Sequence, residues 1–353
     1  MYREYPLFSK YKVLALFLIN CFIFLIVFGF FEMALRIVKV GYGSAPLEGS
    51  VMLHHEHPKN YSFLVHDVGG EFQENAFVHY DAEGLRFNPG TAKNDEDLPV
   101  FSFVGDSFVE ATQVAWENSF VGILENDLID RGKVKNFGVS AYSPVLSYLQ
   151  WDRIGKKYQP GYVVHLLYSN DPREDKGYFE KAEFSEQGEI VCVEGVNTKM
   201  ANLLRRSYVV RYLRKMWLHL EYNRKYKEQD VVKSESNKLL EESPELTALT
   251  EKYILKLKEE VEEASGKYIL SAVPSKYRHI GAVETEQAEF AQKVEEWAFE
   301  NNILYIDLVE PFKNAASKNE ELFYKKDIHF NLAGHEVVAK TILEFFDEEI
   351  AMQ

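Results

Sequence analysis

Short apolar segments alternate with helix-compatible segments from residue 100 onward, and this alternation constrains the fold more than any other feature. We predict strands at 100–104, 134–139, 162–168, 267–273 and 303–308. Residues 162–168, YVVHLLY, are almost continuously apolar, which is typical of a strand covered on both faces in a parallel sheet. Because strand–helix–strand units are joined by right-handed crossovers, we predict an α/β fold: a three-layer α/β/α sandwich around a mostly parallel sheet.

A long segment at about 172–265 separates the third and fourth predicted strands, and we expect it to form a helical insertion. Between residues 205 and 227 it carries eight cations and one acidic residue, although the whole chain has a formal net charge of −15. One interpretation is a helix that packs its aromatic face on the domain and keeps its cations in water. The other is a surface that contacts anionic lipid headgroups or an acidic polymer.

The N-terminal segment 13–31 contains 19 residues without a charged side chain, which is enough for a helix to cross the ~30 Å hydrocarbon core of a bilayer. The apolar run is longer than a signal-peptide core and lacks small residues at a cleavage point, so we expect an uncleaved anchor. A buried core helix is the alternative. Three cations precede the run and two follow it closely, which places the N-terminus in the cytoplasm; they are Arg3, Lys10 and Lys12, then Arg36 and Lys39. We therefore predict a single-pass membrane protein whose bulk is extracytoplasmic, either periplasmic or at the cell surface.

These patterns divide the chain into a cytoplasmic tail (1–12), a transmembrane anchor (13–35), a linker with an irregular, partly β segment (36–98), and an α/β domain (99–353). The negative net charge argues against a nucleic-acid partner. The two cysteines, Cys21 and Cys192, suggest neither a disulfide framework nor a thiolate metal site. We expect no metal and no cofactor.

Polar residues with catalytic potential follow the first three predicted strands and precede the last helix. They are Ser107, Gly138, Asn170, Asp327 and His329. Ligands of doubly wound sheets bind at the carboxyl ends of the strands, so we expect these residues to converge there.

A serine needs a base and an oxyanion site to act as a nucleophile. His329 is the candidate base and Asp327 its orienting carboxylate. The N–H groups of Ser107 and Gly138 and the amide of Asn170 are candidate oxyanion donors.

Each of these residues also has a purely structural interpretation. Asp106 and Ser107 are good helix caps, and glycine and asparagine are common in turns. The placement of all of them at one edge of one sheet favours the catalytic interpretation. If residues 327–329 are extended, the side chains of Asp327 and His329 point the same way and Ile328 points into the core.

The chain resembles the SGNH, or GDSL-like, hydrolase superfamily from about Tyr80 to its end, with the insertion and the anchor outside the shared core. Four motif blocks occur in order: Gly105-Asp106-Ser107-Phe108, Asn136-Phe137-Gly138 with Tyr142-Ser143, Asn170-Asp171, and Asp327-Ile328-His329 with Asn331 and Gly334. The resemblance implies a flavodoxin-like fold, with Ser107 as the nucleophile, His329 as its base and Asp327 as the partner of His329. It also implies an oxyanion hole formed by Ser107, Gly138 and Asn170.

Two positions depart from the pattern of this superfamily. Tyr168 stands where the family often has a glycine, two residues before Asn170, and we expect it to narrow or reshape the acyl pocket. Lys326 stands where the family usually has the acid, three residues before His329, so Asp327 is only two residues away. This shorter spacing is similar to that of the membrane-tethered and polysaccharide-acetylation branches of the group.

The resemblance implies a membrane-anchored serine esterase that cleaves O-acyl esters through an acyl-enzyme, with a small ester or an acylated envelope glycan as substrate. One alternative is an O-acyltransferase that modifies an exported polysaccharide, with polysaccharide-export or acylation proteins as partners. Another is a non-catalytic glycan-binding or assembly protein with the same fold. The site residues alone do not decide between hydrolysis and transfer, because either water or a sugar hydroxyl can accept the acyl group.

Overall fold

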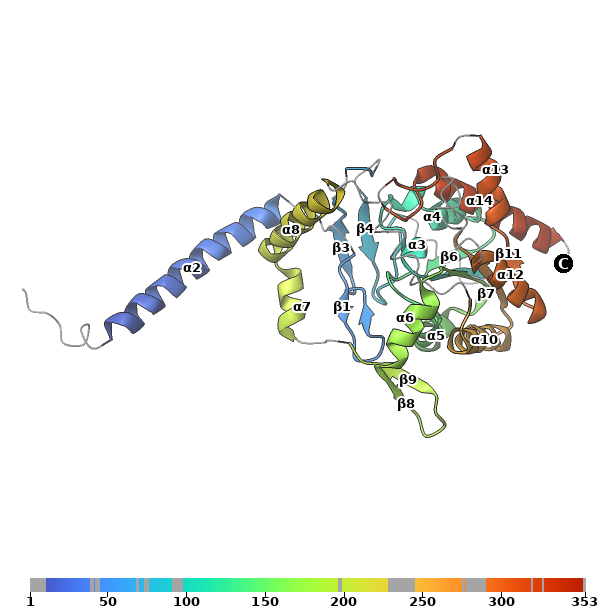
Figure 1. Cartoon of the computed structure of the whole chain (residues 1–353), viewed down its shortest axis with the longest axis horizontal. Coiled ribbons are helices and arrows are strands. Elements are labelled where there is room, and N and C mark those ends of the chain that lie inside the picture. The colour runs from blue at the N-terminus through green and yellow to red at the C-terminus, as the bar shows by residue number, and fades with distance from the viewer. Residues whose placement is uncertain are drawn as a thin grey trace, which may run out of the picture.

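A computed structural model of the chain describes residues 11–38, 41, 45–67, 70–72, 76–90, 98–195, 199–227, 245–274, 276, 290–318, 320–325 and 327–351. One long helix, α2 (Lys12–Ile37), projects from the body that holds the sheet and the other helices (Figure 1). The 26 residues of α2 span about 39 Å at ~1.5 Å per residue. This helix is long and apolar enough to cross a membrane, and none of its residues is buried within the protein.

The central sheet has five parallel strands in the order β11-β10-β7-β5-β6. In chain order these are β5 (Val100–Gly105), β6 (Lys133–Asn136), β7 (Pro160–Leu167), β10 (Lys267–Ala272) and β11 (Leu304–Ile306). The first of them lies between the second and the third, so the strand order reverses beside β5. In doubly wound sheets such a reversal opens a crevice at the carboxyl ends of the strands. The predicted α/β fold with a mostly parallel sheet is confirmed.

Apolar side chains that alternate along the strands cover both faces of this sheet. On β7, Val164 and Leu166 belong to one core, whereas Val163 and Leu167 belong to the other. The first core is covered by α4 (Phe120–Asp127), α13 (Val309–Ser317) and α14 (Leu332–Ala351). The second is covered by α5 (Pro144–Arg153), α10 (Ala248–Glu263) and α12 (Phe290–Glu300). Burial on both faces explains why the sequence of β7 is apolar almost without interruption.

The segment before the sandwich forms two small antiparallel sheets. They pair β1 (Glu48–Gly49) with β2 (His55–Glu56), and β3 (Tyr61–Leu64) with β4 (Phe77–Tyr80). The buried side chain of Arg86 joins this segment to the sandwich. Its guanidinium donates to the carbonyl oxygens of Glu110, Ala111 and Val114 at 2.6, 2.7 and 2.8 Å. These bonds fix the turn that follows the first helix of the sandwich.

The segment between β7 and β10 contains both helices and strands. In chain order these are α6 (Asp171–Phe179), β8 (Ala182–Phe184), β9 (Ile190–Val193), α7 (Lys199–Arg206), α8 (Tyr208–Lys227) and α10. The helical insertion expected at 172–265 is therefore mixed, because β8 and β9 pair as an antiparallel hairpin. Its last helix, α10, is a layer of the sandwich, since Ile254, Leu257 and Val261 are buried in one of the two cores.

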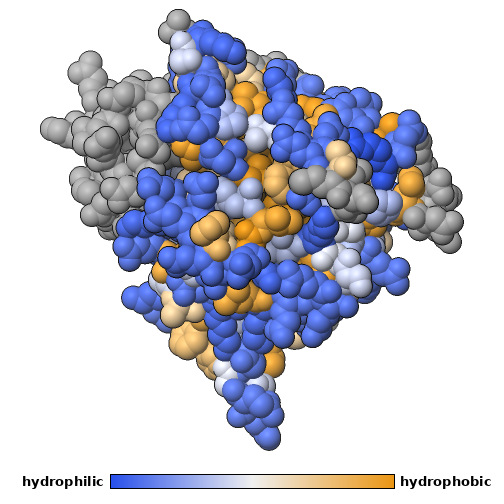
Figure 2. Space-filling view, turned by 90° about the vertical axis from the view of Figure 1, so that its right-hand side faces the viewer, coloured by the Kyte–Doolittle hydropathy of each residue, from blue (hydrophilic) through white to orange (hydrophobic). Residues whose placement is uncertain are grey.

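The side of the body that faces away from α2 is mainly hydrophilic. In the described part of that side, apolar residues appear only as small areas between charged and polar ones (Figure 2). This is the usual surface of a protein in contact with water. It contrasts with the exposed apolar side chains of α2.

Candidate active site

Ser107 is held at the junction between β5 and the short helix α3 (Ser107–Glu110). Gly105 ends the strand with a φ of 154°, and a Cβ at this position would lie 2.7 Å from the Leu166 carbonyl oxygen. Only glycine allows such a close approach. Asp106 then caps the helix, because its carboxylate accepts a hydrogen bond from a main-chain N–H of the first turn at 2.9 Å. The Gly-Asp-Ser sequence therefore starts the helix and also holds the serine hydroxyl at the junction between strand and helix.

Three side chains that are far apart in the sequence meet at this junction. Ser107 Oγ lies 2.7 Å from His329 Nε2, and His329 Nδ1 lies 2.5 Å from Asp327 Oδ1. The carboxylate fixes Nδ1 as the donor nitrogen of the neutral imidazole, and this leaves Nε2 to accept the proton of the Ser107 hydroxyl. The arrangement is that of a nucleophile, a base and an orienting acid.

The two-residue spacing between Asp327 and His329 is accommodated by a turn. Asp327 Oδ1 also accepts a hydrogen bond from the His329 main-chain N–H at 2.9 Å. Such a bond from a side chain to the backbone two residues on competes with an extended strand. Residues 327–329 therefore do not meet the condition of an extended segment, and Ile328 packs on the core as expected but also lines the pocket beside Ser107. Lys326 lies outside the described residues.

Burial opposes charge on both His329 and Asp327, but the two groups stabilise each other. Asp327, followed by Asp106 and Glu110, overcomes the effect of burial and raises the pKa of His329. In the same way, His329 overcomes the effect of burial and lowers the pKa of Asp327. The ammonium group of Lys276 donates to the Asp327 carbonyl oxygen at 3.0 Å, and its charge also lowers the pKa of Asp327. The protonated form of His329 is thereby stabilised.

The three side chains open into a pocket of about 340 Å³, whose wall also contains Asn170 and Ala141. Ala141 follows β6 and has a φ of 64°, in the left-handed region that non-glycine residues seldom adopt. The N–H groups of Ser107 and Ala141 make no hydrogen bond with the described residues. That of Ser107 is one of the unpaired donors of a helix start. With the Asn170 amide, these groups can serve as oxyanion donors.

Gly138, which we expected in the oxyanion hole, is not among the residues of this pocket. Its N–H donates to Asn136 Oδ1 at 2.8 Å, and Asn136 Nδ2 donates to the Val109 carbonyl oxygen at 2.7 Å. A Cβ on Gly138 would lie only 2.2 Å from Glu110 N. The glycine therefore allows close packing against α3, and Ala141, three residues later, faces the pocket in its place.

The region that carries this site matches a known protein family. Residues 103–337, more than half of the chain, match the GDSL-like Lipase/Acylhydrolase family. The chain belongs to this family. The match begins within β5 and ends within α14, so it includes Ser107, Asn170 and His329. No curated protein matches the sequence.

Several solved structures are similar to this GDSL-like chain. A lipolytic protein of the G-D-S-L family from Veillonella parvula has 13% sequence identity and a TM-score of 0.41, covering 71% of this chain and 98% of its own. An acetyl xylan esterase has 16% identity and a TM-score of 0.41, covering 69% and 98%. A catalytic mutant of an acetylxylan esterase from Geobacillus stearothermophilus has 14% identity and a TM-score of 0.41, covering 70% and 93%. These identities are too low to transfer a substrate.

Two carboxylates with raised pKa values lie beside the three side chains of the GDSL-like site. Burial, and then the nearby Asp106, raises the pKa of Glu174 to about 8. Burial also raises the pKa of Asp106 to about 6, although its capping hydrogen bond acts in the opposite direction. Asn170 Nδ2 donates to Glu174 Oε1 at 2.8 Å. Near neutral pH Glu174 is therefore mostly protonated, and Asn170 does not face a full negative charge. The only sequence signal for Glu174 was its position four residues after Asn170 on a helix.

Glu110 is a buried residue of the site that no sequence pattern indicated. Its carboxylate accepts hydrogen bonds from Tyr80 OH at 2.6 Å, Ser140 N–H at 2.9 Å and Ser140 Oγ at 2.5 Å. It also lies 3.0 Å from His57 Nε2. Burial opposes the ionised form, but His57 and these donors lower the pKa of Glu110 to about 2. Since Ser140 directly precedes Ala141, this carboxylate fixes the loop that brings Ala141 to the pocket wall.

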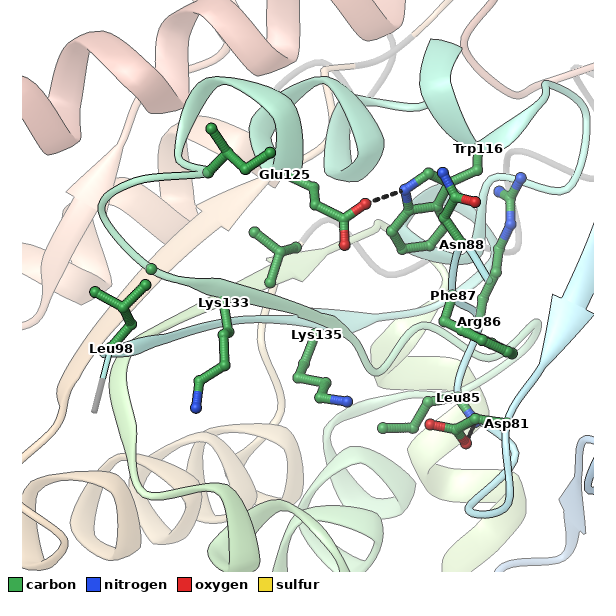
Figure 3. A pocket seen from close by; sticks show the side chains of 13 residues that line it. Asp81, Leu85, Arg86, Phe87, Asn88, Leu98, Trp116, Glu125, Lys133 and Lys135 are labelled. Carbon is green, nitrogen blue, oxygen red and sulfur yellow. Dashed lines mark hydrogen bonds between the residues drawn. The ribbon is translucent and has the colours of Figure 1, made fainter. Parts of the chain in front are cut away.

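A separate pocket lies along the edge strand β6 (Figure 3). Lys133 and Lys135 extend from the strand on one side of it, and Trp116 Nε1 donates to Glu125 at 2.8 Å on the other. None of the three candidate catalytic residues lines this pocket. Among the described residues, no group of three or more histidine, cysteine, aspartate and glutamate side chains is arranged to hold a metal ion.

We expect Gly138→Ala to destabilise the folded chain by about 1–3 kcal/mol, because the added methyl group must displace the main chain of Glu110. Gly177→Ala on α6 is the matched control, since nothing lies within 4 Å of its added Cβ. Alanine is also favoured over glycine in a helix by ~1 kcal/mol. Urea unfolding of the detergent-solubilised chain measures both. Equal stabilities of the two variants would contradict the packing role of Gly138.

We expect Glu174→Gln to stabilise the chain at alkaline pH. The pKa of Glu174 is raised from 4.5 to about 8 in the folded state, so its contribution to stability is present at low pH and is lost as the pH rises from the lower value through the higher one. The variant should therefore melt at least about 2 °C above the wild type at alkaline pH, with little difference in acid. Glu259→Gln, on the exposed face of α10, is the control. A difference in Tm that is the same across the pH range would show that Glu174 does not titrate as described.

Proposed function

We propose that this chain is a membrane-anchored serine esterase of the SGNH type, which cleaves O-acyl esters through an acyl-enzyme. The observation that carries the proposal is the pair of contacts that links Ser107 Oγ to His329 at 2.7 Å and His329 to Asp327 at 2.5 Å. Membership of the GDSL-like acylhydrolase family supports an ester hydrolase. In this proposal Ser107 is the nucleophile, His329 the base and Asp327 the residue that orients His329.

The chain of contacts from Asp327 through His329 to Ser107 allows Ser107 to be acylated by the ester. His329 Nε2 takes the proton of Ser107 as Oγ bonds to the carbonyl carbon of the ester. The carbonyl oxygen becomes an oxyanion, and the donors positioned to stabilise it are the N–H groups of Ser107 and Ala141 and the amide of Asn170. When the oxyanion collapses, the bond to the leaving alcohol breaks and His329 gives its proton to that alcohol. Asp327 stabilises the imidazolium between the two proton transfers.

The acyl-enzyme is then cleaved by an oxygen nucleophile from which His329 removes a proton. Water gives hydrolysis, which the family supports, and a sugar hydroxyl gives O-acyl transfer to a glycan, which is the alternative. Thr112, Gln113 and Ser140 give the pocket wall a polar side that suits a substrate rich in hydroxyl groups, such as an O-acylated envelope glycan. Tyr168 also lines the pocket, and its bulk favours a short acyl group.

We further propose that α2 is an uncleaved anchor, with residues 1–12 in the cytoplasm and the catalytic domain at 99–353 outside it. The motive is the excess of cations before the charge-free run, compared with those that follow it. In this orientation residues 36–98 connect the membrane to the domain, and the active site reaches esters of the cell envelope. Polysaccharide-export or acylation proteins are the partners that this location suggests.

Analysis of the products tests the proposed activity. The full-length chain in detergent is incubated with short acyl esters of a neutral sugar, with and without an unacylated glycan as acceptor. We expect release of the free carboxylic acid at a rate that does not depend on the acceptor. An acylated glycan as the main product would replace the esterase with a transferase. Absence of turnover by the folded chain under both conditions would contradict the proposal and favour a glycan-binding protein.

We expect Asp327→Asn to lower ester turnover by about 10³–10⁴ in a folded protein, because the amide can no longer stabilise the imidazolium or fix its tautomer. Asp347→Asn is the control, since Asp347 is an exposed residue that pairs with Arg131 at 2.6 Å outside the pocket. Steady-state kinetics on a short acyl ester measures both variants. Turnover near that of the wild type in Asp327→Asn would remove Asp327 from the mechanism and leave a pair formed by Ser107 and His329.

A further inference from the structure

Helix α8 exposes a row of apolar side chains that no described part of the protein covers. Leu213, Met216, Trp217 and Leu220 are between 46% and 64% exposed. Their spacing of three and four residues places them on one face of the helix. The neighbouring helix α7 continues this apolar surface with Met200, Leu203 and Leu204, which are likewise exposed. Tyr212 and Trp217 are 40% and 59% exposed, so these two aromatic side chains do not pack on the domain, in contrast to one interpretation of the sequence.

The beginning of α8 is fixed to the end of the membrane helix α2. Glu32 accepts hydrogen bonds from the main-chain N–H groups of Tyr208 and Val209, both at 3.0 Å, and from the Ser207 hydroxyl at 2.8 Å. The guanidinium of Arg36, one turn later on α2, lies 4.8 Å from the centre of the Tyr208 ring. Glu32 directly follows the charge-free run, so α7 and α8 meet at the level where the apolar part of α2 ends. Figure 1 shows both helices between α2 and the body.

Cations accompany the apolar row of α8. Arg214 and Arg224 are exposed, and residues 205–227 hold eight cations and one acidic residue in a chain of net charge −15. At least three of the eight have structural partners: Arg205 donates to the Leu47 carbonyl oxygen, Arg206 pairs with Glu48, and the buried Arg211 lies 4.0 Å from the centre of the Tyr208 ring. An exposed apolar face with flanking cations, at the end of a membrane span, is typical of a helix that lies in the membrane interface. Tryptophan is enriched at that level of a bilayer.

We propose that α7 and α8 form a membrane platform on the extracytoplasmic surface of the membrane that α2 spans. The platform inserts its apolar row between the lipid headgroups and binds anionic phospholipid through its cations. The platform rests on the proposed anchoring by α2 but not on the esterase chemistry. It holds the domain against the surface instead of letting it move freely on its linker. A second copy of the chain suits the same face less well, because two such cationic segments repel each other.

Tryptophan fluorescence gives a direct test, because α2 contains none of the four tryptophans. Trp116 and Trp151 are buried, Trp217 lies on the platform, and Trp297 lies on α12 in the body. The full-length chain is reconstituted in vesicles of phosphatidylglycerol and brominated phosphatidylcholine, whose acyl chains carry the bromine. We expect the bromine to quench part of the fluorescence of the wild type. Trp217→Phe should remove most of this quenching, whereas the matched control Trp297→Phe should leave it unchanged.

The charge of the platform is tested in the same vesicles. The double variant Arg214→Glu, Arg224→Glu should lower the quenching of Trp217 by about twofold or more, because it weakens attraction to anionic headgroups. Vesicles without phosphatidylglycerol should lower the quenching of the wild type in the same way. Quenching that is indifferent to both changes would overturn the binding of anionic lipid.

Further outcomes distinguish failure of the platform from failure of the proposed anchor or of the proposed esterase. If Trp217→Phe leaves the quenching unchanged while the chain resists alkaline extraction and hydrolyses esters, the platform is wrong and the anchor and the esterase stand. Release of the chain by alkaline extraction would contradict the anchor and, with it, the platform. Quenching of Trp217 that falls as the protein-to-lipid ratio rises would show that a second copy covers this face, which also overturns the assignment to lipid.

Discussion

The parallel pairing of β5 with β6 and β7 is the constraint on which the site depends. Because the three strands run in the same direction, the segments that follow them open at one edge of the sheet, and they bring Ser107, Ala141 and Asn170 to one pocket. Gly105 permits this geometry, since a side chain there would collide with β7. The loop before α14 then delivers His329 to the same edge from the far end of the chain.

Carboxylates around the pocket differ in charge because they differ in their partners. Glu110 is buried and Asp327 partly buried, but histidines and hydrogen-bond donors surround them, so that their pKa values are lowered. Asp106 is buried and Glu174 partly buried, both with weaker compensation, and burial raises their pKa values. The ionised carboxylates therefore support His329 and the loop that contains Ala141, whereas Glu174 beside Asn170 is mostly uncharged near neutral pH.

Local patterns made the fold and most of the site predictable, and long-range contacts limited the rest. Apolar runs and capping residues identified the strands and helix starts, and motif order identified the residues that meet in the pocket. The sequence indicated Gly138, and not Ala141, as a candidate oxyanion donor, because no local sequence pattern predicts an alanine with positive φ. It also missed the turn at 327–329, where a side-chain bond overrides the extended backbone. The role of Glu110 was not predictable, since its partners come from separate segments of the chain.

The environment of Trp217 was ambiguous in the sequence, because an apolar helix face has the same spacing whether protein or lipid covers it.

The central claim is that Ser107 becomes acylated, and mass spectrometry after rapid acid quenching tests it most directly. The full-length chain is mixed with p-nitrophenyl acetate, quenched before the steady state and digested. The geometry predicts that the peptide containing Ser107 gains one acetyl group, and that this acetylated peptide does not form in Ser107→Ala. Hydrolysis of the ester with no acetyl group on Ser107, or with the acetyl group on another residue, would contradict the claim.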